Sequence, residues 1–253
     1  MKSGGLMQAF AFLLKAREGS GTVRLLFSCI RYYKNGGDVP DCCANKKPGS
    51  LLGGIMPIGV HLVCGLQVVT RQRAKVVPMA QGDVVEIGFG SGLNLPHYDR
   101  SAVRSLIGIN PDDGLPELAR KAIARQDLPV ELLVESAEAM SLSSASADTV
   151  VVTYSLCSIP DVLAALREAH RILRPHGRLL FCEHGRSPKG RVARMQDRFN
   201  APWRWMAAGC HLNRNTGALI RETGFEMEHY DIYDLGLGTR ILGTHHVGVA
   251  RKR

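Results

Sequence analysis

An acidic residue followed by a glycine triplet is the part of this sequence with the most specific chemistry. Two valines precede Glu86, and Gly88, Gly90 and Gly92 follow it at alternate positions. Glycines tolerate positive φ angles, and they let a ligand approach the backbone without meeting a Cβ atom. A strand that runs into such a loop is a general nucleotide-binding device of open α/β sheets. Because a carboxylate at Glu86 would repel a pyrophosphate, we expect the loop to hold a cationic ligand.

The spacing of these residues resembles motif I of the class I S-adenosylmethionine-dependent methyltransferases, E/D-x-G-x-G-x-G. The resemblance implies that Glu86, Gly88, Gly90 and Gly92 bind S-adenosylmethionine, with the first three around its amino-acid part. It also implies the fold class, which is α/β. We expect a Rossmann-like, doubly wound and mostly parallel sheet, to which this chain adds a helical N-terminal extension.

The residue pattern outside the loop agrees with that fold. Apolar runs predict strands at 83–87, 105–109, 131–134, 149–154, 178–182, 225–233 and 246–250. Helical spacing predicts helices at 51–73 (with breaks), 116–125, 161–173, 191–207 and 214–222. Strands that alternate with helices indicate right-handed crossovers within a doubly wound sheet. The ligand of such a sheet lies beyond the carboxyl ends of its strands, so the residues that follow each strand should form the site.

The resemblance assigns roles to residues that follow the next strands. Asn110 stands where the family usually has an acid that accepts hydrogen bonds from the cofactor ribose, and asparagine offers one neutral carbonyl there. Asp112 is the alternative ribose partner. The backbone N–H of Ala137 and the carboxylate of Glu138 are expected at the adenine edge, although an acid at Glu138 also suits a helix start. Tyr154 begins the motif IV region, which flanks the donor methyl group.

A narrower resemblance concerns the methyl acceptor. Cys157-Ser158, Glu183-His184 and the segment 209–214 look like the thiol S-methyltransferase group of methyltransferase-like protein seven and its bacterial relatives. The resemblance implies a small lipophilic acceptor, with a thiol ahead of an amine. Two alternatives stay open, namely a phospholipid or small-amine N-methyltransferase and a non-catalytic S-adenosylmethionine-binding module.

Two neighbouring residues are the catalytic candidates. A thiol has a pKa near ~8.5, so modest help from a base yields the thiolate. His184 is expected to be that base, with Glu183 orienting it, and the other interpretation is a structural pair at the end of a strand. Methyl transfer needs no protein nucleophile, so Cys157 is expected to form a pocket wall. No metal site is expected, because Cys210 and His211 are adjacent and the His245-His246 pair lacks partners.

Composition limits the partners and the compartment. The formal net charge is +9, which suits a solvated basic surface or attraction to anionic lipid or an acidic substrate. Nucleic acid is not expected, since the chain has no zinc-finger spacing, no RNA-recognition aromatic motif and no long basic run. Seven cysteines at irregular spacing favour free thiols in a reducing compartment, so we expect a cytoplasmic protein.

The first part of the chain differs from the rest. We expect residues 1–47 to be an accessory extension and residues 48–253 to be the methyltransferase domain. Basic amphipathic segments at 6–15 and 22–34 allow peripheral membrane contact, and a partly disordered leader is the other interpretation. Residues 51–69 carry no charged side chain, but four glycines and Pro57 make a membrane span a poor interpretation.

Overall fold

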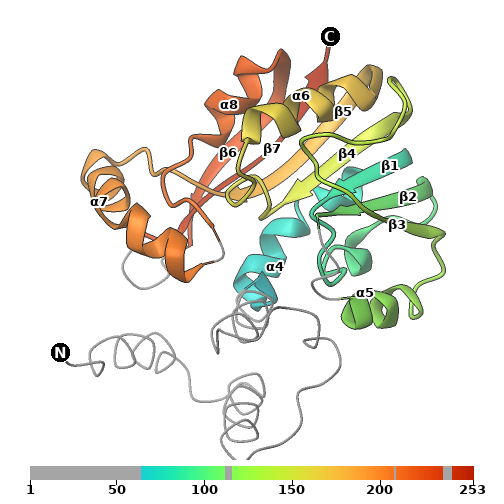
Figure 1. Ribbon diagram of the computed structural model, residues 1–253, viewed down its shortest axis with the longest axis horizontal. Helices are drawn as coiled ribbons and strands as arrows, with labels where there is room; N and C mark the ends of the chain where they lie inside the picture. The colour runs from blue at the N-terminus through green and yellow to red at the C-terminus, as the bar shows by residue number, and fades with distance from the viewer. Residues whose placement is uncertain (1–63, 112–115, 208, 236–240) are drawn as a thin grey trace, which may run out of the picture. The chain divides into compact units, whose positions relative to one another are not determined.

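The computed structural model describes residues 64–111, 116–207, 209–235 and 241–253 (Figure 1). The strands are β1 (Gly82–Ile87), β2 (Val103–Asn110), β3 (Val130–Val134), β4 (Ala147–Thr153), β5 (Leu173–His184), β6 (Phe225–Asp234) and β7 (Thr244–Lys252). The α-helices are α4 (Gln67–Arg73), α5 (Pro116–Ile123), α6 (Val162–Ile172), α7 (Gly190–Met206) and α8 (Thr216–Glu222). Two short 3₁₀ turns, η2 (Val77–Met79) and η3 (Leu95–His97), flank the first strand and its loop.

The strands form one sheet in the order β3-β2-β1-β4-β5-β7-β6. The strands from β1 to β5 pair in parallel, and β7 runs antiparallel to both of its neighbours. The expected Rossmann-like, doubly wound and mostly parallel sheet is therefore confirmed. Because β1 lies between β2 and β4, the ends of these strands meet at one edge, with the end of β5 next to them.

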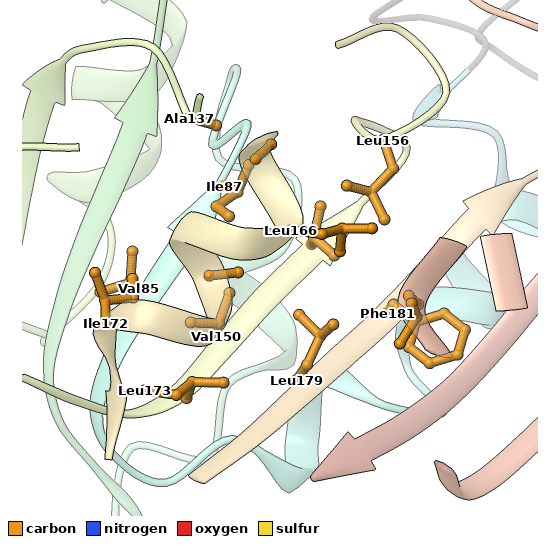
Figure 2. Packing of buried hydrophobic residues seen from close by; sticks show 14 of the residues in the cluster. Val85, Ile87, Ala137, Val150, Leu156, Leu166, Ile172, Leu173, Leu179 and Phe181 are labelled. Atoms are coloured by element: carbon orange, nitrogen blue, oxygen red, sulfur yellow. The ribbon is translucent and has the colours of Figure 1, made fainter. Parts of the chain in front are cut away.

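The sheet has an apolar core on each face. In β4, Val150 and Val152 belong to the cluster that includes α6 and α8, whereas Val151 belongs to the cluster that includes α5. This division follows from the alternation of side chains along a strand. Figure 2 shows part of the first cluster, in which Leu166 of α6 lies among residues of β4 and β5. With both faces covered, β4 reads as a continuous apolar run.

Helix α6 illustrates how local sequence sets an element. Asp161 caps its N-terminus by accepting a 2.9 Å hydrogen bond from the backbone N–H of Ala164. Five side chains at helical spacing turn inward and are buried, namely Val162, Ala165, Leu166, Ala169 and Ile172. The predicted helix, 161–173, agrees with the observed bounds to one residue at each end.

Strand β5 is longer than predicted at both ends. The predicted strand covered 178–182, whereas β5 runs from Leu173 to His184. Its start is set by pairing between Leu173 and Ala147 of β4, across a register shift. Its end is extended because Glu183 and His184 pair with β7. This extension places both catalytic candidates inside a strand.

Several predictions fall on residues outside the described ranges. These are the accessory extension at 1–47, the domain boundary at 48, most of the predicted helix 51–73, and Asp112. Within the described ranges no helix is both long enough and apolar enough to cross a bilayer.

Candidate active site

The loop after β1 turns through glycines in the left-handed region. Gly88, Gly90 and Gly92 have φ angles of +73°, +56° and +78°. A Cβ atom on Gly88 would come within 1.9 Å of Oγ of Ser155, which belongs to the turn after β4. A Cβ atom on Gly90 would approach nothing closer than 3.8 Å. Gly88 therefore allows the two loops to pack together, and Gly90 leaves its backbone open to a ligand.

Glu86 lies beneath this loop. Its side chain is 1% exposed, and its two oxygens accept hydrogen bonds from Nδ2 of Asn94 (2.9 Å) and from the hydroxyl of Tyr98 (2.7 Å). Burial raises the pKa of Glu86 to about 7, although both hydrogen bonds and the nearby Arg73 oppose the rise. We expected Glu86 at the amino-acid part of the cofactor. Each oxygen already accepts one hydrogen bond from the protein, and a contact between Glu86 and the amino-acid part of the cofactor stays a prediction.

Arg73 joins this network from helix α4. Its Nη1 donates to Oδ1 of Asn94 (3.1 Å) and to Oγ1 of Thr153, and its guanidinium stacks on Tyr154 at 4.6 Å. Asn94 thus links the buried cation to Glu86. Sequence reasoning missed Arg73, Asn94 and Thr153, because their meeting depends on the path of the chain. A weak signal was present in Asn94, a polar residue that follows the glycines within an apolar stretch.

The expected ribose partner is partly engaged. Oδ1 of Asn110 accepts a 2.9 Å hydrogen bond from the backbone N–H of Gly90. The amide carbonyl that we expected at the ribose therefore ties the glycine loop to β2. Its remaining lone pair and its N–H₂ group are the parts of Asn110 that can still meet a hydroxyl.

Glu138, the residue expected at the adenine edge, is hydrogen-bonded within the protein. Glu138 accepts hydrogen bonds from the backbone N–H of Asp161 (2.6 Å) and from Oγ of Ser136 (3.0 Å). Its carboxylate joins the loop after β3 to the start of α6, and its expected role at the adenine edge stays a prediction. Ala137 is buried in the core cluster, and a contact between its backbone N–H and adenine stays a prediction.

Tyr154 follows β4 in a strained conformation. Its φ angle is +54°, which a bulky side chain rarely adopts and which costs on the order of 1–3 kcal/mol. Its hydroxyl accepts from the thiol of Cys182 (3.3 Å), and its ring meets that of His245 edge-on at 5.5 Å. Such strain is typical of ligand sites, and here it directs the chain into the turn that packs against Gly88.

Glu183 shapes that same turn. Its side chain is fully buried, and it accepts hydrogen bonds from the backbone N–H groups of Ser155 (2.8 Å), Leu156 (3.1 Å) and Cys157 (3.2 Å). Burial raises the pKa of Glu183 to about 7 against the effect of these amides. We expected Glu183 to orient His184, and this expectation is corrected. Adjacent residues in a strand point to opposite faces, and the carboxylate holds the turn after β4.

His184 stands at the end of β5, and one of its ring nitrogens has no partner in the part of the chain that the structure describes. The side chain is 8% exposed, and its Nδ1 lies 3.8 Å from Sγ of Cys210. Its Nε2 is buried and has no hydrogen-bond partner within the described residues. A buried nitrogen without a partner is costly, so this atom is suited to meet a group on a ligand. Its catalytic role stays a prediction.

The segment after α7 covers this end of the sheet. The backbone N–H of His211 donates to the carbonyl of Cys157 (2.7 Å), and Nη1 of Arg214 donates to the carbonyls of Leu156 and Ile159. These contacts place Cys210 beside His184. Among the described residues no group of three or more His, Cys, Asp or Glu is arranged to hold a metal ion.

The geometry suits a cationic ligand on the glycine loop. The space beside the Cα atom of Gly90 is open, and the buried carboxylate of Glu86 supplies negative potential from below. S-adenosylmethionine, with its sulfonium and amino group, fits these features. The neutral Asn110 amide beside Gly90 is compatible with ribose hydroxyls.

Comparison with known proteins identifies this arrangement. Residues 85–181 match the family model described as "Methyltransferase domain". Human thiol S-methyltransferase TMT1B is 32% identical over 169 residues, which cover 63% of this chain and 68% of the human protein. The mitochondrial methyltransferase OMS1 of Saccharomyces cerevisiae is 27% identical over 175 residues, which cover 62% of this chain and 37% of that protein. The chain spans from 37% to 59% of the length of the first curated relatives that it matches.

A solved structure supports the fold. The N-methyltransferase NodS from Bradyrhizobium japonicum, in complex with S-adenosyl-L-homocysteine, gives a TM-score of 0.55 at 13% identity, over 74% of this chain and 88% of that chain. From the domain match, the similarity to TMT1B and the order of the sheet, we conclude that the chain belongs to the class I S-adenosylmethionine-dependent methyltransferases, in the group that includes the thiol S-methyltransferase TMT1B.

Proposed function

We propose that this methyltransferase acts on the sulfur atom of a small lipophilic thiol. The observation that carries the proposal is the Nε2 atom of His184, which is buried and lacks a partner among the described residues. It lies at the end of β5, at the edge of the sheet where ligands of this fold bind. The similarity to TMT1B supports the choice of a thiol over other acceptors.

The chemistry requires little of the protein beyond alignment and removal of one proton. The cofactor supplies an activated methyl group on a sulfonium. A thiol with a pKa near ~8.5 is mostly protonated at neutral pH, and histidine is the side chain that most often accepts a proton in catalysis. His184 would receive that proton on Nε2. Glu183 would keep the turn 155–157 in place against the glycine loop.

Exposed apolar side chains on α7 are a candidate contact surface for a lipophilic acceptor. Met195 and Phe199 lie one turn apart on α7, and both are exposed. The next residue, Asn200, accepts a 2.9 Å hydrogen bond from the backbone N–H of Leu212, in the segment that carries Cys210. Helix α7 is thus joined to the covering segment. Its apolar side chains offer a surface that an oily acceptor can contact.

Label transfer tests the acceptor class. The full-length protein is incubated with methyl-labelled S-adenosylmethionine and with alkyl thiols, aryl thiols, small amines or phosphatidylethanolamine vesicles. We expect label in a thioether product, at a rate that increases with the apolar size of the thiol. Label in amine or lipid but not in any thiol would overturn the proposal.

A histidine variant tests the role of His184, the residue on which the proposal rests. We expect His184→Ala to lower turnover of an alkyl thiol by about 10²-fold, a usual contribution of a general base. Cofactor affinity, measured by calorimetry, should stay within about twofold, since the role proposed for His184 is toward the acceptor. His229→Gln is the matched control, because that histidine pairs with Asp231 at the surface. Equal turnover in both variants would remove His184 from the reaction.

A further inference from the structure

Two cysteine side chains meet beside His184, and the proposed reaction has not used them. Two backbone hydrogen bonds hold Cys210 in place. Its own N–H donates to the carbonyl of Ala207 (2.9 Å), and the next N–H, of His211, donates to the carbonyl of Cys157 (2.7 Å). Sγ of Cys210 lies 3.8 Å from Nδ1 of His184. The sulfur is therefore directed at one particular nitrogen of the ring.

The surroundings of Cys210 favour its anionic form. The thiol of Cys157 donates a hydrogen bond to the Cys210 sulfur, and together with His184 it lowers the pKa of the Cys210 thiol to about 4. The same contact raises the pKa of Cys157. The other titratable or charged side chains that act on this pair are Cys64, Glu183, His211 and Arg214. As a thiolate, Cys210 accepts from its neighbours, whereas as a thiol it would donate to the carbonyl of His211 (3.9 Å).

This arrangement decides which nitrogen of His184 can work as a base. An acceptor at Nδ1 selects the tautomer with hydrogen on Nδ1, which leaves the lone pair on Nε2. Nε2 is the atom that is buried and lacks a partner within the described residues. The relationship is analogous to that of a buried aspartate which orients a catalytic histidine.

We propose that Cys210 is a positioning residue for His184. Its sulfur accepts the Nδ1–H hydrogen bond and keeps Nε2 available to the proton of the methyl acceptor. The inference rests on the proposed thiol methylation and names a residue that the reaction then depends on. The contact between Cys210 and His184 does not depend on which acceptor is bound.

The proton and electron balance is simple. The S–H bond of the acceptor breaks, its proton moves to Nε2, and its electron pair stays on the acceptor sulfur. That pair forms the new carbon–sulfur bond while the donor's carbon–sulfur bond breaks and leaves its pair on the donor sulfur. The sulfur of Cys210 stabilises the imidazolium in the meantime, and the proton then passes to water.

Acceptors of different acidity test the proposal. An aryl thiol that is already ionised at pH 7 needs no base, whereas an alkyl thiol does. We expect Cys210→Ala to lower kcat/KM for the alkyl thiol by about 10-fold or more and to change that for the acidic aryl thiol by less than about threefold. Cys210→Asp should restore much of the alkyl-thiol activity, because a carboxylate also accepts from Nδ1. All assays contain a reductant, which keeps the thiols free.

The outcomes separate this proposal from the proposed function. If the wild type methylates no thiol, the proposed function fails. If His184→Ala selectively impairs the alkyl thiol but Cys210→Ala does not, only the positioning role of Cys210 fails. An equal loss on both thiols in Cys210→Ala, without rescue by aspartate, would show a merely structural residue.

A measurement on the wild type covers the case in which the variants do not fold. The protein is labelled with ¹³C and ¹⁵N, and the ring signals of His184 are assigned by through-bond correlation to its own backbone. We expect ¹⁵N shifts of a ring protonated at Nδ1 and unprotonated at Nε2 at pH 8. A ring protonated at Nε2 alone would overturn the positioning role, whatever the activity assays give.

Discussion

The hydroxyl of Tyr98 donates a 2.7 Å hydrogen bond to Oε2 of Glu86, so the acid of the glycine motif is held from inside the protein. Asn94 occupies the other oxygen and connects it to Arg73. The motif acid is therefore part of a buried network that underlies the loop. Its influence on a ligand acts through charge, and this makes cofactor binding sensitive to the protonation of Glu86.

The first prediction concerns cofactor affinity and pH. Because the pKa of Glu86 lies at about 7, much of this group is protonated at pH 6. A cationic cofactor favours the carboxylate, so binding at pH 6 must expel a proton, at a cost of about 1.4 kcal/mol per pH unit below the pKa. We expect affinity for S-adenosylmethionine to rise by up to about tenfold from pH 6 to pH 8, with proton release seen by calorimetry in buffers of different ionisation enthalpy.

The matched variant for this prediction is Glu86→Gln. The amide keeps the shape and cannot ionise, so affinity should become weaker at pH 8 and lose its dependence on pH. A pH dependence that persists in Glu86→Gln would assign the proton to another group. S-adenosylhomocysteine lacks the sulfonium charge and should show a smaller rise in wild type.

Different parts of this structure could be predicted from sequence to different degrees. Helix α6 was predicted closely, because a capping aspartate and a regular apolar stripe are local signals. The apolar run of β4 was equally clear. The hydrogen bond between Arg73 and Asn94 was not predictable. One residue lies in a helix and the other in a loop, and the irregular chain between them has no periodicity that would indicate the contact. The same holds for Cys210, which reaches His184 from the irregular segment after α7.

The error on Glu183 has a simpler cause. Once 178–182 was recognised as a strand, its continuation places residues 183 and 184 on opposite faces, so the two side chains cannot act on each other directly. The carboxylate then needed donors of its own, and the backbone amides after the neighbouring strand supply them.

The second prediction follows from the buried carboxylate of Glu183. Its pKa in the folded protein is about 7, above the unfolded value near ~4.5. The folded state therefore holds the proton more tightly, and the stability that this group contributes is complete below about pH 4.5 and is lost as pH rises through about 7. We expect Glu183→Gln to flatten the fall in the free energy of unfolding between pH 5.5 and pH 7.5 by about 1–3 kcal/mol, measured with urea. Glu226→Gln, at an exposed ion pair, should leave the slope unchanged.

The third prediction removes one donor from the network below the loop. Tyr98→Phe leaves Oε2 of Glu86 buried without its hydrogen bond, which should cost about 1–3 kcal/mol of unfolding free energy at pH 8. Tyr233→Phe is the control, since its hydroxyl donates to Asp231, which is partly exposed. A loss in Tyr98→Phe no larger than in the control would mean that water or another donor satisfies Glu86.

The fourth prediction separates the two roles assigned to the glycine loop. Gly88→Ala introduces a Cβ atom 1.9 Å from Oγ of Ser155 and strains a backbone with φ of +73°, so its thermal midpoint should fall by several degrees more than that of Gly90→Ala. Gly90→Ala also has a positive φ but meets open space, so the protein should fold and bind S-adenosylmethionine about tenfold or more weakly, because the methyl group occupies the ligand's path. Midpoints are compared by calorimetry without cofactor, and affinities by titration. Full cofactor affinity in a folded Gly90→Ala variant would show that the ligand does not pass over this glycine. The cofactor would then have to bind at another part of the loop.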